Sequence, residues 1–177
     1  MTTFFGPSSS IPQSPQPSPS STPISAFHLL FSAIINHSLS TPDPDLYLHN
    51  LGEQVSIRSF DYIYLPIRGI RRESKLFNLL QFITTYTWKW FFTKTAELSQ
   101  SEEEFIIEDR NLILNKFISP GTGDDNLLNC GGAFASGIVE GVLKRSGVKY
   151  QGSVYSLFKN EDKIDQDWSA TLLVIKK

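Results

Sequence analysis

The spacing of apolar residues changes along this chain, and the change limits the folds open to it. Before Glu104, apolar side chains recur at the three- and four-residue intervals of amphipathic helices. After Glu104 they come mainly in short runs typical of strands, with one more helical stretch between them. The order of elements is three helices, a hairpin, a helix and a hairpin. This order predicts an α+β domain in which four helices pack with a small antiparallel β-sheet.

Capping residues and chain breakers set the expected boundaries. Ser25 is a good N-cap for the first helix, Asp45 is the expected cap of the second, and Gly147 follows the fourth as a C-terminal glycine. The predicted helices span residues 26–38, 45–65, 73–98 and 126–146. The predicted strands are 105–107 with 112–114 in one hairpin, and 148–158 with 168–174 in another.

The third predicted helix is apolar around nearly its whole circumference, with many aromatic side chains. Its uncharged run, from Leu76 to Trp88, is only thirteen residues long, which is too short to span a membrane. A helix of this kind is either central in the fold or shared with a neighbouring chain.

The first 24 residues differ in composition from the rest. They hold six of the ten prolines and no charged side chain, and they offer few apolar groups to offset the entropy lost on ordering. We therefore predict a disordered Pro/Ser-rich tail over 1–24 and one folded domain over 25–177. Ser14, Ser18 and Thr22 each precede a proline, so the tail is either a plain spacer or a substrate of a proline-directed kinase. It lacks the positive charge and early apolar run of a signal peptide.

Charge and cysteine content exclude several classes of protein. With 16 Lys+Arg and 18 Asp+Glu, the formal charge is −2, so there is no basic surplus for binding nucleic acid. One cysteine forms no internal disulfide and no zinc site built on several thiolates, which fits a reducing, cytosolic setting.

Residues that could carry catalysis or bind a metal are few and scattered. His28 and His37 face opposite sides of the first helix, and His49 stands alone on the second. Cys130 has no base nearby in the sequence, so a buried, inert thiol is favoured over a nucleophile. Neither a P-loop nor a Gly-x-Ser-x-Gly elbow occurs. We predict no catalytic residue, metal ion or cofactor.

A ridge of small residues follows one face of the fourth helix at four-residue spacing: Ala133, Gly137 and Gly141. Each glycine costs about 1 kcal/mol relative to alanine inside a helix, so the spacing predicts a compensating close approach of another backbone. Tight packing in the core is the favoured reason, and a ligand tunnel beside the ridge is the alternative.

Five stretches of the chain, taken in order, resemble the Bet-three-like family of small subunits of the transport protein particle (TRAPP). They are residues 25–35, 51–55, 72–80, 104–108 and 128–143. The most specific part of the resemblance lies in the last stretch, in a motif made of Asn129, Cys130, Phe134, Gly137, Ile138 and Glu140. The Pro/Ser-rich tail lies outside the family pattern.

The resemblance implies four helices against a small antiparallel sheet, and a structural role. Members of this kind act as adaptors in an assembly that tethers vesicles in ER-to-Golgi and Golgi traffic and catalyses nucleotide exchange on a Rab GTPase. The implied partners are a Bet-three-type subunit, in a heterodimer, and a longin-like small subunit, with the Rab GTPase reached only through the whole complex. The implied location is cytoplasmic, peripheral to Golgi and endoplasmic reticulum membranes, and no catalytic residue carries over.

One departure from the family concerns acylation. The related Bet-three subunit holds an acyl chain in an internal channel, attached to a cysteine just before the third helix. The corresponding segment here, residues 65–72, has no cysteine, so covalent acylation at that place is impossible. The alternative to an adaptor is a small-molecule or lipid-binding domain with an apolar pocket lined by the third helix.

The first two helices carry more apolar surface than a domain of this size and one small sheet can cover. Such a surface fits a permanent interface rich in aromatic side chains. We predict contact with the Bet-three-type partner through eight residues: Phe27, Leu30, Phe31, Ile34, Leu48, Leu51, Val55 and Tyr62.

Overall fold

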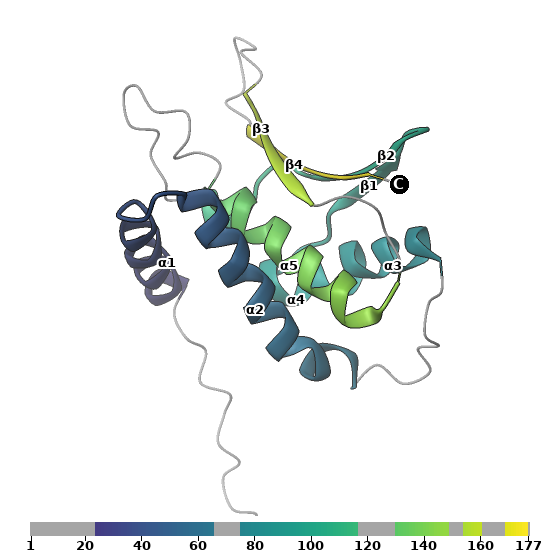
Figure 1. Ribbon diagram of the computed structural model, residues 1–177, viewed down its shortest axis with the longest axis horizontal. Helices are drawn as coiled ribbons and strands as arrows, with labels where there is room; N and C mark the ends of the chain where they lie inside the picture. Colours follow the sequence, from purple (N-terminus) through teal and green to yellow (C-terminus); the bar gives the residue numbers. More distant parts are fainter. Residues whose placement is uncertain (1–23, 66–74, 117–129, 149–153, 161–168, 177) are drawn as a thin grey trace, which may run out of the picture.

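The computed structural model describes residues 24–65, 75–116, 130–148, 154–160 and 169–176. The predicted tail, residue 24 apart, lies outside these ranges, as do the expected start of the fourth helix and the connection between the second and third. The helices are α1 (Ile24–Ser38), α2 (Pro44–Tyr64), α3 (Leu76–Phe82), the π-helical η1 (Ile83–Thr87), α4 (Trp88–Phe92), the 3-10 turn η2 (Ile113–Asn115) and α5 (Cys130–Ser146). Figure 1 shows α2 beside α5 beneath the sheet, with α1 on the outer side of α2.

Four antiparallel strands form the sheet: β1 (Glu97–Gln100), β2 (Glu104–Asp109), β3 (Tyr155–Asn160) and β4 (Ser169–Lys176), in the order β1-β2-β4-β3. Side chains of β2 alternate between the two faces, so that Phe105 and Ile107 are buried while Glu104 and Ile106 are half-buried. The pairing register places Leu173 and Ile175 of β4 on the same buried face. The predicted α+β fold is confirmed, and so is the pairing of the last two strands.

The prediction for the first hairpin is wrong in its second strand. Residues 112–114 do not pair with β2, whose neighbours are β1 and β4. The carboxylate of Asp109 accepts the backbone N–H of Asn111 over 2.9 Å and turns the chain, and η2 follows. Leu112 and Leu114 then enter the core from this turn, which explains their strand-like alternation.

The third helical stretch ends earlier than predicted and changes its winding. It ends at Thr93, which adopts a left-handed conformation (φ 65°), so residues 97 and 98 belong to β1 instead. A π-helical turn interrupts it, and the hydroxyls of Thr84 and Thr85 both donate to the carbonyl of Gln81, over 3.0 and 2.8 Å. One side of the stretch packs into the core, where Trp88 is buried, while its other side exposes aromatic rings.

Helix α2 begins one residue before the predicted start, with a different cap. The side chain of Asp43 accepts the backbone N–H of Leu46 over 3.0 Å, and Pro44 takes the first helical position, where its missing N–H costs nothing. Asp45 therefore lies within the first turn. At the end of α5, Gly147 has the positive φ (70°) expected of a C-terminal glycine.

Candidate functional site

The small residues of α5 face α2. A Cβ atom added at Gly137 would collide with the carbonyl oxygen of His49, and one at Gly141 with the side-chain oxygen of Ser56. From the other side, a Cβ at Gly52 of α2 would collide with the carbonyl oxygen of Phe134. The close backbone approach that the ridge predicts is therefore an approach to α2. Ala133 is buried in the same core.

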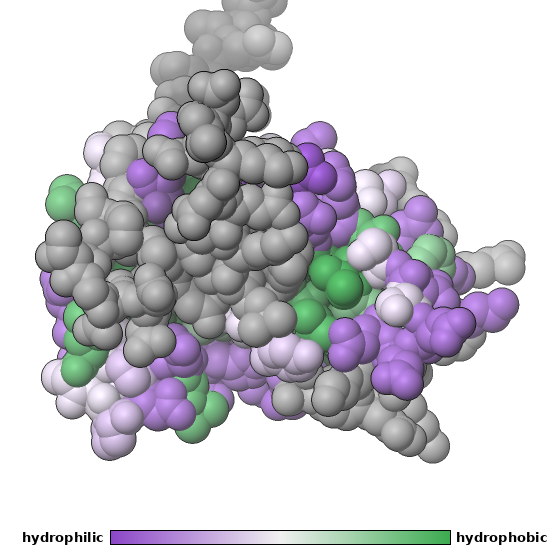
Figure 2. All heavy atoms as spheres, turned by 90° about the horizontal axis from the view of Figure 1, so that it is seen from above, coloured by the Kyte–Doolittle hydropathy of each residue, from purple (hydrophilic) through white to green (hydrophobic). Residues whose placement is uncertain are grey.

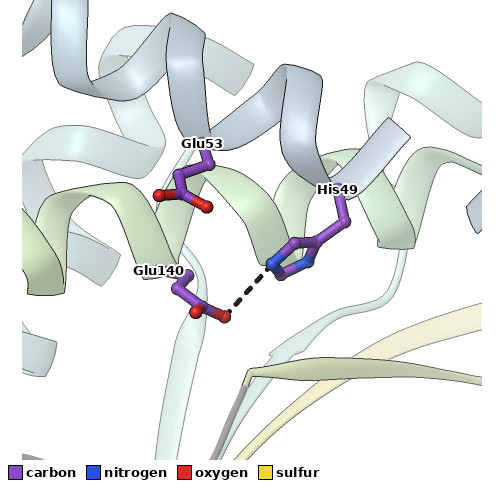
Figure 3. Close-up of side chains that lie close together, drawn as sticks. All are labelled: His49, Glu53 and Glu140. Atoms are coloured by element: carbon purple, nitrogen blue, oxygen red, sulfur yellow. Dashed lines mark ion pairs between the residues drawn. The ribbon is translucent and has the colours of Figure 1, made fainter. Parts of the chain in front are cut away.

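A group of charged side chains closes this contact along one edge, and we call it the seam cluster: His49 and Glu53 from α2, with Glu140 and Lys144 from α5. The ammonium of Lys144 lies 2.9 Å from Oε1 of Glu53 and 3.0 Å from Oε1 of Glu140. Nε2 of His49 lies 3.1 Å from Oε2 of Glu140, as Figure 3 shows. Each helix contributes two members, so the cluster holds the two helices together.

Two uncharged groups complete the hydrogen bonding of the seam cluster. Nδ1 of His49 lies 2.9 Å from Oγ of Ser136, on the next turn of α5 toward its start. The backbone N–H of Val154, just before β3, donates to Oε2 of Glu140 over 3.4 Å. Glu140 thus links both helices to the segment that enters the sheet.

The surroundings of Glu140 change its acidity. The hydrogen bond from His49 is the largest effect and, together with the hydrogen bond and charge of Lys144, it outweighs burial and lowers the pKa of Glu140 from 4.5 to about 2. Burial alone would lower the pKa of Lys144, but its hydrogen bonds to Glu53 and Glu140 outweigh that effect and raise it. Glu140 is therefore a carboxylate at neutral pH.

A divalent metal is a poor fit to this cluster. Ligand atoms of His49, Glu53 and Glu140 lie within 4.8 Å of one another, which is close enough to share an ion. However, the ammonium of Lys144 already binds both carboxylates and offsets one of their two negative charges. The residues present fit an internal ion-pair network.

The seam cluster corrects one interpretation of the sequence. His49 is not alone, because it meets Ser136 and Glu140 from a helix that lies far along the chain. The regular spacing of small residues on α5 predicted a close neighbour for that helix, but no local spacing identifies α2 as the neighbour.

Cys130 opens α5 and is buried. Burial is the main cause that raises the pKa of its thiol to about 11, and the nearby charge of Asp45 adds to it. The thiol is therefore un-ionised at neutral pH, as an inert cysteine should be.

The other motif residues are also packing residues. The ring of Phe134 meets that of Phe31 edge-on at 5.6 Å, which joins α5 to α1. Ile138 is fully buried. Asn129 lies outside the described residues.

The structure divides the eight predicted interface residues into three groups. Phe31 and Leu48 belong to the buried core, at 4% and 0% exposure, so the prediction that they contact a partner is wrong: they pack within the chain, Phe31 against Phe134 of α5. Ile34, Leu51 and Val55 are half-buried. Phe27, Leu30 and Tyr62 are exposed.

Sequence reasoning missed further exposed leucines in the same region. Leu29 is 73% exposed beside Leu30 on α1, and Leu46 is exposed on the first turn of α2. Helix α1 contains no Lys, Arg, Asp or Glu at all, and that absence is the sequence signal that apolar side chains lie on its outward side too, beside the exposed Ser32, Asn36 and His37. We call Phe27, Leu29 and Leu30 the α1 outer face.

Other exposed apolar groups lie elsewhere and are more dispersed. Phe77, Tyr86 and Trp90 emerge from α3, η1 and α4. Figure 2, seen from above relative to Figure 1, shows hydrophobic residues gathered to the right of its centre and smaller hydrophobic groups near its left edge, among hydrophilic residues. Among the helices in the described part of the chain, none is long and apolar enough to cross a membrane.

Comparison with known proteins gives one consistent family. Residues 27–173 match the family model described as transport protein particle (TRAPP) component. The chain is 36% identical over 132 residues to trafficking protein particle complex subunit 5 of Mus musculus, covering 70% of this chain and 69% of that protein. The human protein of the same name gives the same values. That of Dictyostelium discoideum is 33% identical over 128 residues, covering 68% of each chain.

A solved structure with a similar fold is that of trafficking protein particle complex subunit 3 from Naegleria fowleri, covalently bound to palmitic acid. Its TM-score is 0.61, at 17% identity, over 87% of this chain and 95% of that one. This likeness concerns the fold alone. The family model covers most of the chain, and the two subunit 5 relatives from mouse and Dictyostelium are 36% and 33% identical to it over their aligned residues. The chain therefore belongs to the TRAPP component family.

Proposed function

We propose that this chain is a structural subunit of a TRAPP complex and acts as an adaptor that holds other subunits together. The observation that carries the proposal is the α1 outer face, which is exposed, apolar and free of charge. Isolated exposed leucines are ordinary, but a whole uncharged helix surface of this kind marks an interaction site. The subunit 5 relatives are named as parts of such a complex.

The proposed main partner is a Bet-three-type subunit, in a heterodimer. Its contact uses the α1 outer face and continues over α2 through the exposed Tyr62 and the half-buried Leu51 and Val55. An aromatic side chain such as Tyr62, 78% exposed in the isolated chain, is a typical anchor of a permanent interface. A longin-like small subunit is the second proposed partner.

The proposed role involves no reaction on this chain. The charged groups of the seam cluster are paired with one another, and the thiol of Cys130 is un-ionised. A Rab GTPase would be engaged only by the whole complex, which would act in ER-to-Golgi and Golgi traffic while peripheral to those membranes.

The test is co-purification of the full chain with a Bet-three-type subunit, using two matched tyrosine variants. Tyr62→Asp, in the proposed interface, should weaken binding by at least about 30-fold, which is the effect of losing one strong anchor. Tyr86→Asp replaces another exposed tyrosine, on η1 and 49% exposed, and should leave binding unchanged. Equal effects of the two variants, or a wild-type chain that stays monomeric beside the partner, would contradict the proposal.

The lipid-binding alternative ranks lower because no contact among the described residues favours it. On the inner side of α3, η1 and α4, Leu80, Ile83 and Trp88 are packed into the core. Native mass spectrometry of the same sample tests it, since a stoichiometric lipid in place of a protein heterodimer would reverse the ranking.

A further inference from the structure

The helical stretch formed by α3, η1 and α4 turns aromatic side chains outward as well as inward. Tyr86 and Trp90 each leave about half of their surface exposed. They are four residues apart, so they lie one turn apart on the same side of the stretch. Each of these side chains has a large apolar ring with one polar group. The surface of the chain therefore carries a pair of amphipathic rings here.

The ring of Tyr86 is the outer end of a column of four rings that joins α2 to this stretch. The ring centroids of Phe60 and Tyr64 are 4.0 Å apart, and those of Tyr64 and Phe82 are 4.8 Å apart. The rings of Phe82 and Tyr86 are stacked, again at 4.8 Å. The hydroxyl of Tyr64 also lies 3.4 Å from that of Thr87, which ties the column to η1. The exposed ring is thus held in place before anything binds to it, so binding costs little side-chain entropy.

The same stretch carries positive charge and no negative charge. From Lys75 to Ala96 the sequence contains three lysines and no Asp or Glu. Lys94 is paired with Asp109 at 2.5 Å, whereas Lys75 and Lys89 are exposed. The outer side of the stretch therefore combines aromatic rings with positive charge.

This surface differs in kind from the α1 outer face. The side chains of the α1 outer face have no polar group, and their helix has no charged residue, which suits the dry centre of a protein interface. Lysine is depleted from interfaces of that kind. Tyrosine, tryptophan and lysine together are instead typical of a membrane surface, where rings lie among the lipid headgroups and ammonium groups meet phosphates.

We infer that the outer side of α3, η1 and α4 is a contact site for the surface of an anionic lipid bilayer, with Tyr86, Lys89 and Trp90 at its centre. The two rings enter the headgroup layer, and the ammonium of Lys89 binds lipid phosphates and carboxylates. Figure 1 shows α1 and α3 at opposite sides of the molecule, so the proposed partner contact on α1 does not lie over α3. The inference does not depend on the Bet-three-type partner, because the chain by itself carries the whole site.

Co-sedimentation of the full chain with lipid vesicles tests the site. At about 0.1 M salt, the chain should bind phosphatidylcholine vesicles that contain about 30% phosphatidylserine. Binding to vesicles of phosphatidylcholine alone should be at least about fivefold weaker, which is the effect of one lysine near an anionic surface. Equal binding to the two kinds of vesicle, or no binding to the anionic vesicles at about 5 mM lipid, would overturn the inference. Either result would leave another protein as the occupant of this surface.

Matched variants locate the contact, with circular dichroism as the check that each is folded. Trp90→Gln and Lys89→Glu should each weaken binding to the anionic vesicles by at least about fivefold. Lys116→Glu makes the same charge change at an exposed lysine near His28 of α1 and should weaken binding by less than about twofold. Leu29→Gln, on the α1 outer face, should leave vesicle binding unchanged.

Two patterns among these variants would overturn the inference. One is a loss of vesicle binding in Leu29→Gln that Trp90→Gln does not share, which would move the contact to α1. The other is an equal loss in Lys89→Glu and Lys116→Glu, which would mean that the charge acts without a defined site. The co-purification test of the proposed function uses no lipid, so the two proposals fail independently.

Discussion

The α2–α5 seam and the α1 outer face are two helix surfaces of opposite construction. In the seam, glycines bring two backbones together and every charge of the cluster has a partner within the chain. On α1, leucines face outward and no charged residue occurs. The difference shows that the seam is complete in the single chain, whereas the α1 outer face needs a cover that the described residues do not supply. Substitutions in the seam should therefore cost stability, and substitutions on α1 should cost assembly.

The substitution with the largest expected effect is Gly137→Val, which tests whether the α2–α5 seam is tightly packed. The branched side chain would strike the carbonyl of His49, and neither backbone can yield without separating the helices. We expect a loss of about 4 kcal/mol or more in the free energy of unfolding, or failure to fold. Chemical denaturation followed by circular dichroism measures it. Gly147→Asn is the control, since asparagine tolerates a positive φ, and wild-type stability in Gly137→Val would show that the seam is not tightly packed.

Glu140→Gln should have the next largest effect. It leaves Lys144 and His49 without their shared carboxylate, and breaking a buried ion pair from one side costs about 3 kcal/mol. Folding lowers the pKa of Glu140 from 4.5 to about 2, so the carboxylate stabilises the fold fully above about pH 4.5. That contribution is lost as the pH falls toward about 2. Melting temperatures across this range should therefore fall more steeply for the wild type than for Glu140→Gln, and parallel curves would contradict the lowered pKa.

A smaller effect separates the two candidate caps of α2. Asp43→Ala removes the acceptor for the N–H of Leu46 and should cost about 1 kcal/mol. Asp45→Ala, at the position expected from the sequence, should change stability by less than about 0.5 kcal/mol. Urea denaturation of the two variants compares them directly. A larger loss of unfolding free energy in Asp45→Ala than in Asp43→Ala would mean that Asp45 is the cap, as the sequence predicts.

The smallest effect on stability should come from Leu29→Gln. This side chain is mostly exposed, so the free energy of unfolding should change by less than about 0.5 kcal/mol. Self-association of the isolated chain, measured by analytical ultracentrifugation, should fall because apolar surface is removed. A marked loss of stability would instead mean that α1 packs its outer side against this same chain.

The sequence predicts the helices of this fold better than its strands. The spacing of apolar residues, together with capping and helix-breaking residues, predicts α1, α2 and the end of α5. The spacing of glycines predicts that α5 has a close neighbour. Strand β1 escapes prediction because Glu97–Gln100 is short and largely polar, and its place in the sheet comes from pairing with β2. Residues 112–114 were wrongly predicted as a strand because their buried and less buried side chains alternate as in a strand, although the chain forms a turn there.

The candidate site divides in the same way. Helical spacing predicts the exposed Leu30 and Tyr62 as interface residues, but spacing alone does not separate them from Phe31 and Leu48, which lie in the core. The seam cluster joins residues 87 or more positions apart, and nothing local in the sequence marks His49 as a partner of Ser136. Long-range contacts of this kind depend on how α2 and α5 pair.

The strand order has a consequence for how the chain folds. Strand β4 lies between β2 and β3, so the strand that joins the two halves of the sheet comes after both of them in the sequence. Before β4 is in place, β2 can pair only with β1, and β3 lacks its partner among the described strands. A chain without β4 therefore leaves Phe105 and Ile107 without their partners Ile175 and Leu173 and presents an open edge of β2. An open strand edge of this kind is where a chaperone binds or where aggregation starts.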